Sequence, residues 1–152
     1  MTPSVLSARI VTARLAWVRD MIARIRALPL DTADTFAADS RTPAAAESYL
    51  RRGLEALLDL GRHVLAKGFA VSAAEYKEIA ARLEEVGVLD EADHRVLARL
   101  AGYRNRLVHF YDEISERELY EICAAQLCDV ERVAAAIVNW AKRHPDRFDQ
   151  RI

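Results

Sequence analysis

Four side chains that suit chemistry on a phosphate ester lie within eight residues of one another, at Arg104, Asn105, His109 and Tyr111. A histidine can accept or donate a proton near neutral pH, so His109 can serve as a general base or a general acid. An arginine presents a planar fork of N–H donors that fits two phosphoryl oxygens. Asn105 can orient either the imidazole or the phosphate. These residue types therefore suit acid–base chemistry on a phosphodiester, with a cation for the charge that develops there.

The position of Arg104 within its segment is unusual. It follows Leu97 by seven residues and Leu100 by four, so it falls on the apolar stripe of a predicted helix, where a charge is costly unless it is paired or used. Arg104 and His109 are five residues apart, about 140° around an ideal helix. Three arrangements would still bring the two side chains together. The long Arg side chain reaches across, the helix loosens near its end, or the Arg of one chain meets the His of another chain in a dimer. A structural interpretation is also open, in which Arg104 pairs with a neighbouring acid and His109 caps the helix.

The elements around this segment predict an all-α fold of about five helices. Five Gly and four Pro are few for 152 residues, whereas Ala, Leu, Arg and Glu are plentiful, and this composition favours helices. Capping residues and apolar spacing predict helices over 2–28, 43–67, 72–87, 91–110 and 115–143. Residues 29–42 form a connection anchored by Phe36, and a polar tail begins at about 144. We expect a single domain, 1–152, built as an up-down helical bundle.

Composition and charge exclude several classes of function. With 22 basic and 23 acidic residues the net charge is −1, which disfavours a strongly basic duplex-binding module but leaves a local cationic patch open. Cys123 and Cys128, both predicted in one helix, are too far apart for a disulfide and lack the His partners of a zinc site, so two buried thiols are expected. We expect no metal and no other cofactor, because no carboxylate cluster has metal-ligand spacing. No apolar run approaches the ~18 residues of a membrane span, and no secretory signal begins the chain, so a cytoplasmic location is expected.

The segment 104–111 resembles the signature of the HEPN superfamily, a group of small helical domains whose active members are ribonucleases. That signature is Arg, a polar residue, spacers and then His, and its extended form, Arg-x4-His-x-Tyr, is similar to the HepT branch of toxin–antitoxin pairs. Arg104, His109 and Tyr111 match the three fixed positions, and Asn105 matches the polar second residue. The resemblance covers about residues 45–140 and includes residues 54–64, Gly87-Val88-Leu89 and Gly102-Tyr103.

The resemblance implies the toxin of a type VII-like toxin–antitoxin system, a metal-independent endoribonuclease. Its catalytic residues would be Arg104, His109 and Asn105, with an RNA such as tRNA or mRNA as the substrate. It further implies a homodimer in which two copies of the motif line one cleft. The implied antitoxin is a small nucleotidyltransferase that attaches AMP to Tyr111. The added bulk and negative charge beside Arg104 would then block an RNA phosphate.

Several weaker candidates and one rival function remain. Asp59 is a candidate to pair with Arg104 and support it. Tyr111, taken alone, is also typical of a packed aromatic with its hydroxyl at the rim. Trp17 and Trp140 are expected to fill the core or dimer contacts. The rival function is a non-catalytic HEPN-like helical dimer that binds a nucleotide or a partner protein.

Overall fold

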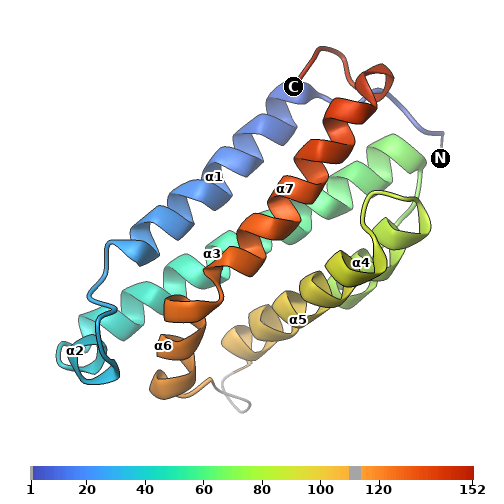
Figure 1. Cartoon of the computed structure of the whole chain (residues 1–152). Helices are drawn as coiled ribbons and strands as arrows, with labels where there is room; N and C mark the ends of the chain where they lie inside the picture. Colours follow the sequence, from blue (N-terminus) through green and yellow to red (C-terminus); the bar gives the residue numbers. More distant parts are fainter. Residues whose placement is uncertain (1, 110–113) are drawn as a thin grey trace.

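The computed structural model describes residues 2–109 and 114–152, and helices joined by short connections make up most of this part of the chain (Figure 1). The described residues form seven α-helices, a π-helical turn and a 3-10 turn: α1 (Ala8–Arg26), α2 (Ala33–Ala37), α3 (Arg41–His63), η1 (Val64–Gly68), α4 (Tyr76–Glu85), α5 (Glu91–Val108), α6 (Glu116–Ala125), α7 (Leu127–Arg143) and η3 (Pro145–Arg147). The predicted all-α class is confirmed, whereas the predicted number of about five helices is too low.

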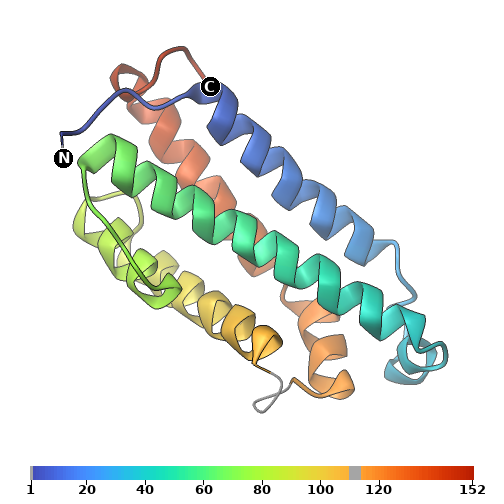
Figure 2. The same cartoon turned by 180° about the vertical axis from the view of Figure 1, so that it is seen from behind.

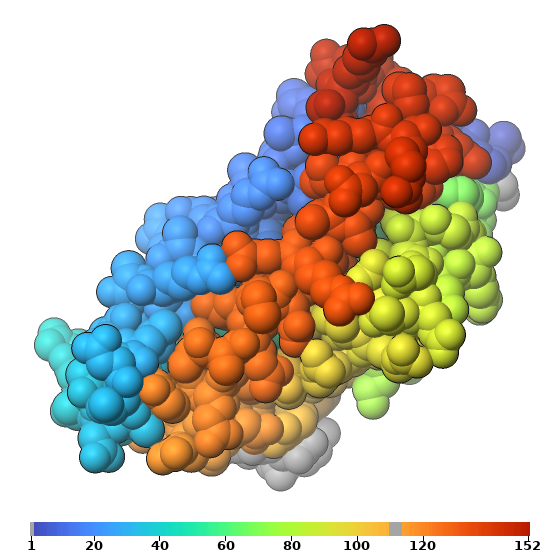
Figure 3. All heavy atoms as spheres, in the orientation of Figure 1, coloured from blue at the N-terminus to red at the C-terminus, as the bar shows by residue number. Residues whose placement is uncertain are grey.

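The four long helices alternate in direction along the bundle. Helix α1 runs antiparallel to α3, and α4 and α5 form a hairpin beside α3 (Figures 1 and 2). On the face drawn in Figure 3, the side chains of α7 fill the space between α1 and the α4–α5 hairpin. This arrangement places the C-terminal half of α5 beside α3, and the site described below lies on these two helices.

One apolar core joins these helices. Its fully buried large side chains include Phe36, Ile25, Leu54, Leu57, Leu58, Ile79, Leu83, Leu97 and Leu100. Phe36 anchors the connection after α1, as predicted, although its surroundings form the short helix α2. Gly61 lets α3 approach α4 closely, because a Cβ at this position would lie 2.8 Å from Ile79 Cγ2. This close contact helps to fix the α4–α5 hairpin against α3.

Helix α1 begins six residues later than the predicted start at Thr2. Ser7 is its N-cap, and the preceding segment is extended and pairs with the C-terminal segment. The Leu6 N–H donates to Arg147 O at 2.8 Å, and the Asp149 N–H donates to Leu6 O at 2.9 Å. The pairing satisfies backbone groups that a longer helix would have used internally.

The C-terminal segment is less exposed than the expected polar tail. Phe148 is 7% exposed and packs edge-on against Trp140, with ring centroids 5.9 Å apart. Trp140 is itself buried, as predicted. None of the helices in the described ranges carries an apolar stretch long enough to cross a bilayer.

The predicted long helix over 115–143 is broken at Gln126, which separates α6 from α7. Gln126 leaves the helical region, with φ −117° and ψ 6°, and its Oε1 accepts a 2.7 Å hydrogen bond from the Tyr103 hydroxyl of α5. Cys123 and Cys128 therefore lie in two helices. Both are free thiols, but only Cys123 is buried, and burial raises its pKa to about 12. Cys128 is exposed, which corrects the expectation for that residue.

Besides the late start of α1, two further predicted helix starts are confirmed and one more is wrong. Asp90 caps α5 by accepting from the Asp93 N–H at 2.7 Å, and Ser115 caps α6. The capping box predicted for the third helix at Ser72 does not form. Helix α4 instead begins after Glu75, which makes no side-chain cap hydrogen bond.

Candidate active site

The end of helix α5 brings the predicted catalytic residues together. The helix ends at Val108, and His109 is its C-cap in an extended conformation, with φ −97° and ψ 97°. The His109 N–H donates to Asn105 O at 3.1 Å. Because His109 has left the helical course, the 140° separation of an ideal helix from Arg104 does not apply to it.

Arg104, Asn105 and His109 line one cavity of about 480 Å³, together with Arg62 of α3, Tyr76 of α4 and the two residues before α4, Ala74 and Glu75. Arg104 and Asn105 are half-buried and His109 is exposed. Two guanidinium groups and an imidazole therefore border the same space. A cavity with this lining suits an anionic ligand such as a phosphate group.

The Arg104 side chain is held from three directions. Its Nε donates to Glu55 Oε1 of α3 at 3.3 Å, and its Nη1 donates to Asn105 Oδ1 at 3.3 Å. Its guanidinium carbon lies 4.5 Å from the centre of the Tyr76 ring. The side chain is 23% exposed. Within the described residues these contacts leave the Nη2 donors for a ligand, so the group is both positioned and able to bind.

Tyr76 lies between Arg62 of α3 and Arg104 of α5 and contacts both. Its ring centre is 4.8 Å from the guanidinium carbon of Arg62 and 4.5 Å from that of Arg104, distances typical of cation–π contacts. Its hydroxyl donates to Asp59 Oδ1 at 3.0 Å. Burial, and then the hydrogen bond to Asp59, raise the pKa of Tyr76, so the hydroxyl stays a donor. Arg62 in turn contacts Asp59 at 3.3 Å and donates from Nε to Ala73 O.

The expected pairing of Asp59 with Arg104 is not the contact that forms. Glu55, one helical turn earlier on α3, is the carboxylate that binds Arg104. Asp59 binds Arg62 and Tyr76 instead, so it contacts Arg104 only through the Tyr76 ring. The contacts of the structural interpretation are therefore present: Arg104 has an acidic partner and His109 is the C-cap of the helix. Tyr111 lies outside the described residues.

Trp17 and the other three histidines of the chain do not line this cavity. Trp17 is 46% exposed on α1 and does not belong to the core. His63 is half-buried on α3, His94 hydrogen-bonds a carboxylate of α4, and His144 stacks on Trp140. No three His, Cys, Asp or Glu side chains gather in the described ranges in a way that could hold a metal ion.

Sequence reasoning missed three residues of this site: Glu55, Arg62 and Tyr76. Glu55, Asp59 and Arg62 follow helical spacing on α3, and that spacing was available as a signal for one charged face. Tyr76 carried no such signal, because its helical period places it with the apolar residues of α4. Its role depends on the packing of α4 against α3 and α5.

Solved structures share this fold. A Shewanella oneidensis HEPN toxin, tri-AMPylated and in complex with MNT antitoxin, is 21% identical with a TM-score of 0.76, over 84% of this chain and 96% of that chain. A toxin–antitoxin structure with AMP-PNP is 20% identical with a TM-score of 0.75, over 84% and 97%. YutE, a cytosolic protein of unknown function from Bacillus subtilis, is 19% identical with a TM-score of 0.72, over 88% and 90%. At these identities the likeness shows a HEPN-like fold.

The sequence itself matches a family model. No curated protein is a significant match to the chain. The model described as Ribonuclease HepT-like matches residues 18–137, a range that holds the C-terminal part of α1, all of the site helices and the larger part of α7. The predicted resemblance is therefore confirmed over more than half of the sequence, and the chain belongs to the HepT-like ribonuclease family.

Proposed function

We propose that this chain is a metal-independent endoribonuclease and the toxin of a type VII-like toxin–antitoxin system. The observation that carries the proposal is the shared cavity, in which Arg104, Asn105 and His109 border the same space in a member of a ribonuclease family. As part of the same proposal, the protein acts as a homodimer in the cytoplasm. The cytosolic description of the Bacillus subtilis neighbour supports that location.

The proposed reaction is cleavage by the 2′-hydroxyl of the RNA. A base removes the 2′-hydroxyl proton, the 2′-oxygen attacks phosphorus, and the bond from phosphorus to the 5′-oxygen breaks as that oxygen receives a proton. His109 is the proton carrier, and in a homodimer the two copies of His109 can serve as base and acid. Arg104 binds the equatorial phosphoryl oxygens, on which negative charge accumulates. Asn105 holds the Arg104 guanidinium in this orientation through its 3.3 Å hydrogen bond.

The proposed partner is a nucleotidyltransferase antitoxin that transfers AMP to Tyr111. The tyrosine oxygen attacks the α-phosphorus of ATP, pyrophosphate leaves, and a phosphodiester remains on the side chain. Support comes from the neighbours: one is a tri-AMPylated HEPN toxin with MNT antitoxin, and another is a toxin–antitoxin pair with AMP-PNP. A phosphate with its nucleoside next to the motif would compete with RNA for the two arginines.

Purified protein, expressed without any antitoxin and incubated with RNA in the presence of a chelator, tests the proposed function. Endonucleolytic cleavage is the expected result. RNA or nucleotide binding without cleavage, by protein whose intact mass shows no modification, would instead favour the non-catalytic dimer.

Tyr76 is expected to position Arg104 in this reaction. Tyr76→Leu removes the ring between the two arginines, and we expect kcat/KM for RNA to fall about tenfold, since a cation–π contact contributes about 0.5–2 kcal/mol. Tyr76→Phe keeps the ring and loses only the bond to Asp59, so it should retain most of the activity. Tyr103→Phe is a matched control, because its hydroxyl bonds Gln126 outside the cavity. Equal activity of Tyr76→Leu and wild type would show that Tyr76 does not position Arg104 for the reaction.

A further inference from the structure

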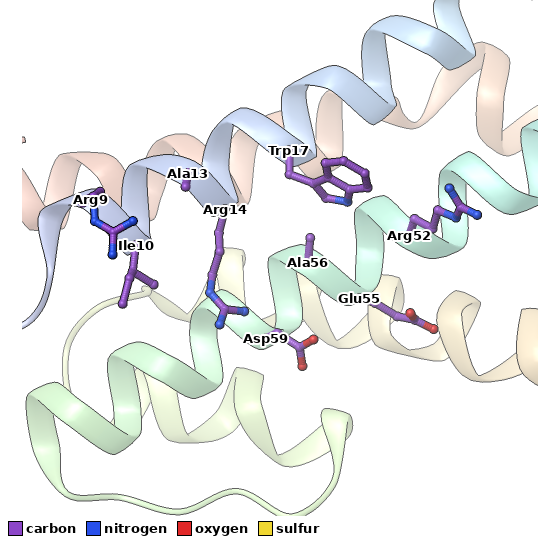
Figure 4. A pocket seen from close by; sticks show the side chains of 9 residues that line it. All are labelled: Arg9, Ile10, Ala13, Arg14, Trp17, Arg52, Glu55, Ala56 and Asp59. Carbon is purple, nitrogen blue, oxygen red and sulfur yellow. The ribbon is translucent and has the colours of Figure 1, made fainter.

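A second hollow lies between α1 and α3. We name it the α1–α3 groove. It has a volume of about 500 Å³ and is lined by Arg9, Arg14 and Trp17 of α1 and by Arg52, Glu55 and Asp59 of α3 (Figure 4). Its size is in the range of small-ligand sites. None of its α1 residues takes part in the contacts described around Arg104.

The groove carries cations that the fold does not neutralise. Among the described residues, Arg9, Arg14 and Arg52 make no ion pair with any carboxylate, whereas thirteen other ion pairs are present there. The pKa of His63 is lowered, mainly by burial and then by the positive charges of Arg14 and Lys67. In a chain whose net charge is −1, this local excess of positive charge favours an anionic partner.

The two acidic residues of the groove do not cancel this charge. Glu55 is bonded to Arg104 at 3.3 Å and to Arg51 at 3.5 Å. Asp59 is bonded to Arg62 at 3.3 Å and also accepts from the Tyr76 hydroxyl. Both carboxylates are therefore already paired with arginines outside the groove. They also join the two hollows, because each one lines the groove and touches residues of that cavity.

Trp17 gives the groove a surface for stacking. Its side chain lies above the small side chain of Ala56, with Ala13 one turn earlier on α1, and it is 46% exposed (Figure 4). Arg9 and Trp17 are eight residues apart, about 12 Å along the helix. An exposed aromatic ring in a line of cations is the arrangement that holds single-stranded nucleic acid, with bases on the ring and phosphates on the arginines.

We infer that the α1–α3 groove binds a single-stranded stretch of the RNA whose scissile phosphate lies in the cavity of Arg104 and His109. This inference rests on the proposed ribonuclease function and adds the path of the substrate. A second copy of this chain fits the groove less well than a polyanion, because its net charge is only −1, whereas a nucleic acid strand offers a phosphate charge at every nucleotide. Nucleotides beyond the cleaved bond would then contribute to affinity on each subunit.

Binding of a 2′-O-methyl single-stranded oligonucleotide tests the inference without cleavage, since the methyl group blocks the attacking oxygen. Trp17 supplies the optical signal, because the other tryptophan, Trp140, is 2% exposed. The oligonucleotide should quench the fluorescence of the wild type but not of Trp17→Phe. Trp17→Ala should weaken binding about tenfold, as expected for the loss of one stacked base.

The arginines are tested by a pair of double variants with the same change in net charge. R9Q/R14Q should weaken binding about tenfold. The slope of log K against log salt should also fall in magnitude by about 1.4, since each cation contributes about 0.7 to that slope on a single strand. The control R95Q/R117Q removes two exposed arginines of α5 and α6 that pair with Glu91 and Glu121, and it should bind like the wild type.

Three results would overturn the inference. R9Q/R14Q and R95Q/R117Q could bind the oligonucleotide equally well. The Trp17 variants could change the oligomeric mass in sedimentation, which would assign the groove to a second copy. R9Q/R14Q could lose a protein partner while keeping RNA affinity. Each of these three results is compatible with RNA cleavage by the wild type and contradicts only the inference about the groove. If the wild type failed to cleave RNA while the oligonucleotide still quenched the fluorescence of Trp17, the result would contradict only the proposed function.

Discussion

His109→Ala is expected to lower the rate of RNA cleavage about 1,000-fold, in the middle of the range for loss of a general acid–base group. Arg104→Ala should lower it 100- to 1,000-fold, as expected when a donor to the transition-state charge is removed. Arg104→Lys should recover only part of this loss, because an ammonium keeps the charge but not the planar fork that Glu55 and Asn105 hold in place. The measurement is single-turnover cleavage of a labelled RNA by purified, unmodified protein.

Two substitutions on the same helix are matched controls. Arg106→Ala removes an arginine that binds Glu118 at 2.7 Å on another side of α5. His94→Ala removes a histidine at the far end of α5, where it bonds α4. Both should cleave RNA at close to the wild-type rate, with helical content checked by circular dichroism. If His94→Ala and His109→Ala lost activity to the same extent, the loss would reflect folding and not proton transfer.

Transfer of AMP to Tyr111 is expected to abolish cleavage completely. Tyr111 follows His109 by two residues in the sequence. A phosphate placed there carries the same charge as the substrate and competes for Arg104 and Arg62. Protein coexpressed with the cognate nucleotidyltransferase should gain one or more AMP units in intact mass, and the modified fraction should be inactive.

Two tyrosine variants separate this site from others. Tyr111→Phe should gain no AMP and should keep its cleavage activity after coexpression. Tyr120→Phe loses only a hydroxyl that donates to Leu30 O, and it should be modified and inactivated like the wild type. A Tyr111→Phe protein that still gains AMP would assign the modification to another residue.

Local signals were sufficient for most of the fold. Helical composition and the caps at Asp90 and Ser115 predict the all-α class and the starts of α5 and α6. The break at Gln126 could not be predicted, because residues 115–143 contain neither Gly nor Pro, and Gln126 is bonded by Tyr103 from a different helix. The late start of α1 likewise depends on pairing with residues near 148, far along the chain.

The candidate site was predictable only in part for the same reason. Residue types and spacing identify Arg104, Asn105 and His109, and the end of the helix after Val108 explains how they border one cavity. Glu55 and Asp59 are four residues apart on one face of α3, so helical periodicity cannot choose between them as the partner of Arg104. The packing of α5 against α3 places Arg104 beside Glu55. The packing of α4 against these two helices places Tyr76 between two arginines.

Cleavage of an RNA with a single 2′-deoxy nucleotide at the scissile position, in the presence of a chelator, tests the central claim most directly. Because the proposed attacking group is the 2′-oxygen, the protein should cut the all-ribose RNA, leave a 2′,3′-cyclic phosphate, and fail to cut the substituted RNA at that bond. Cleavage of the substituted RNA at the same bond, or cleavage that appears only when a divalent metal is added, would contradict the account.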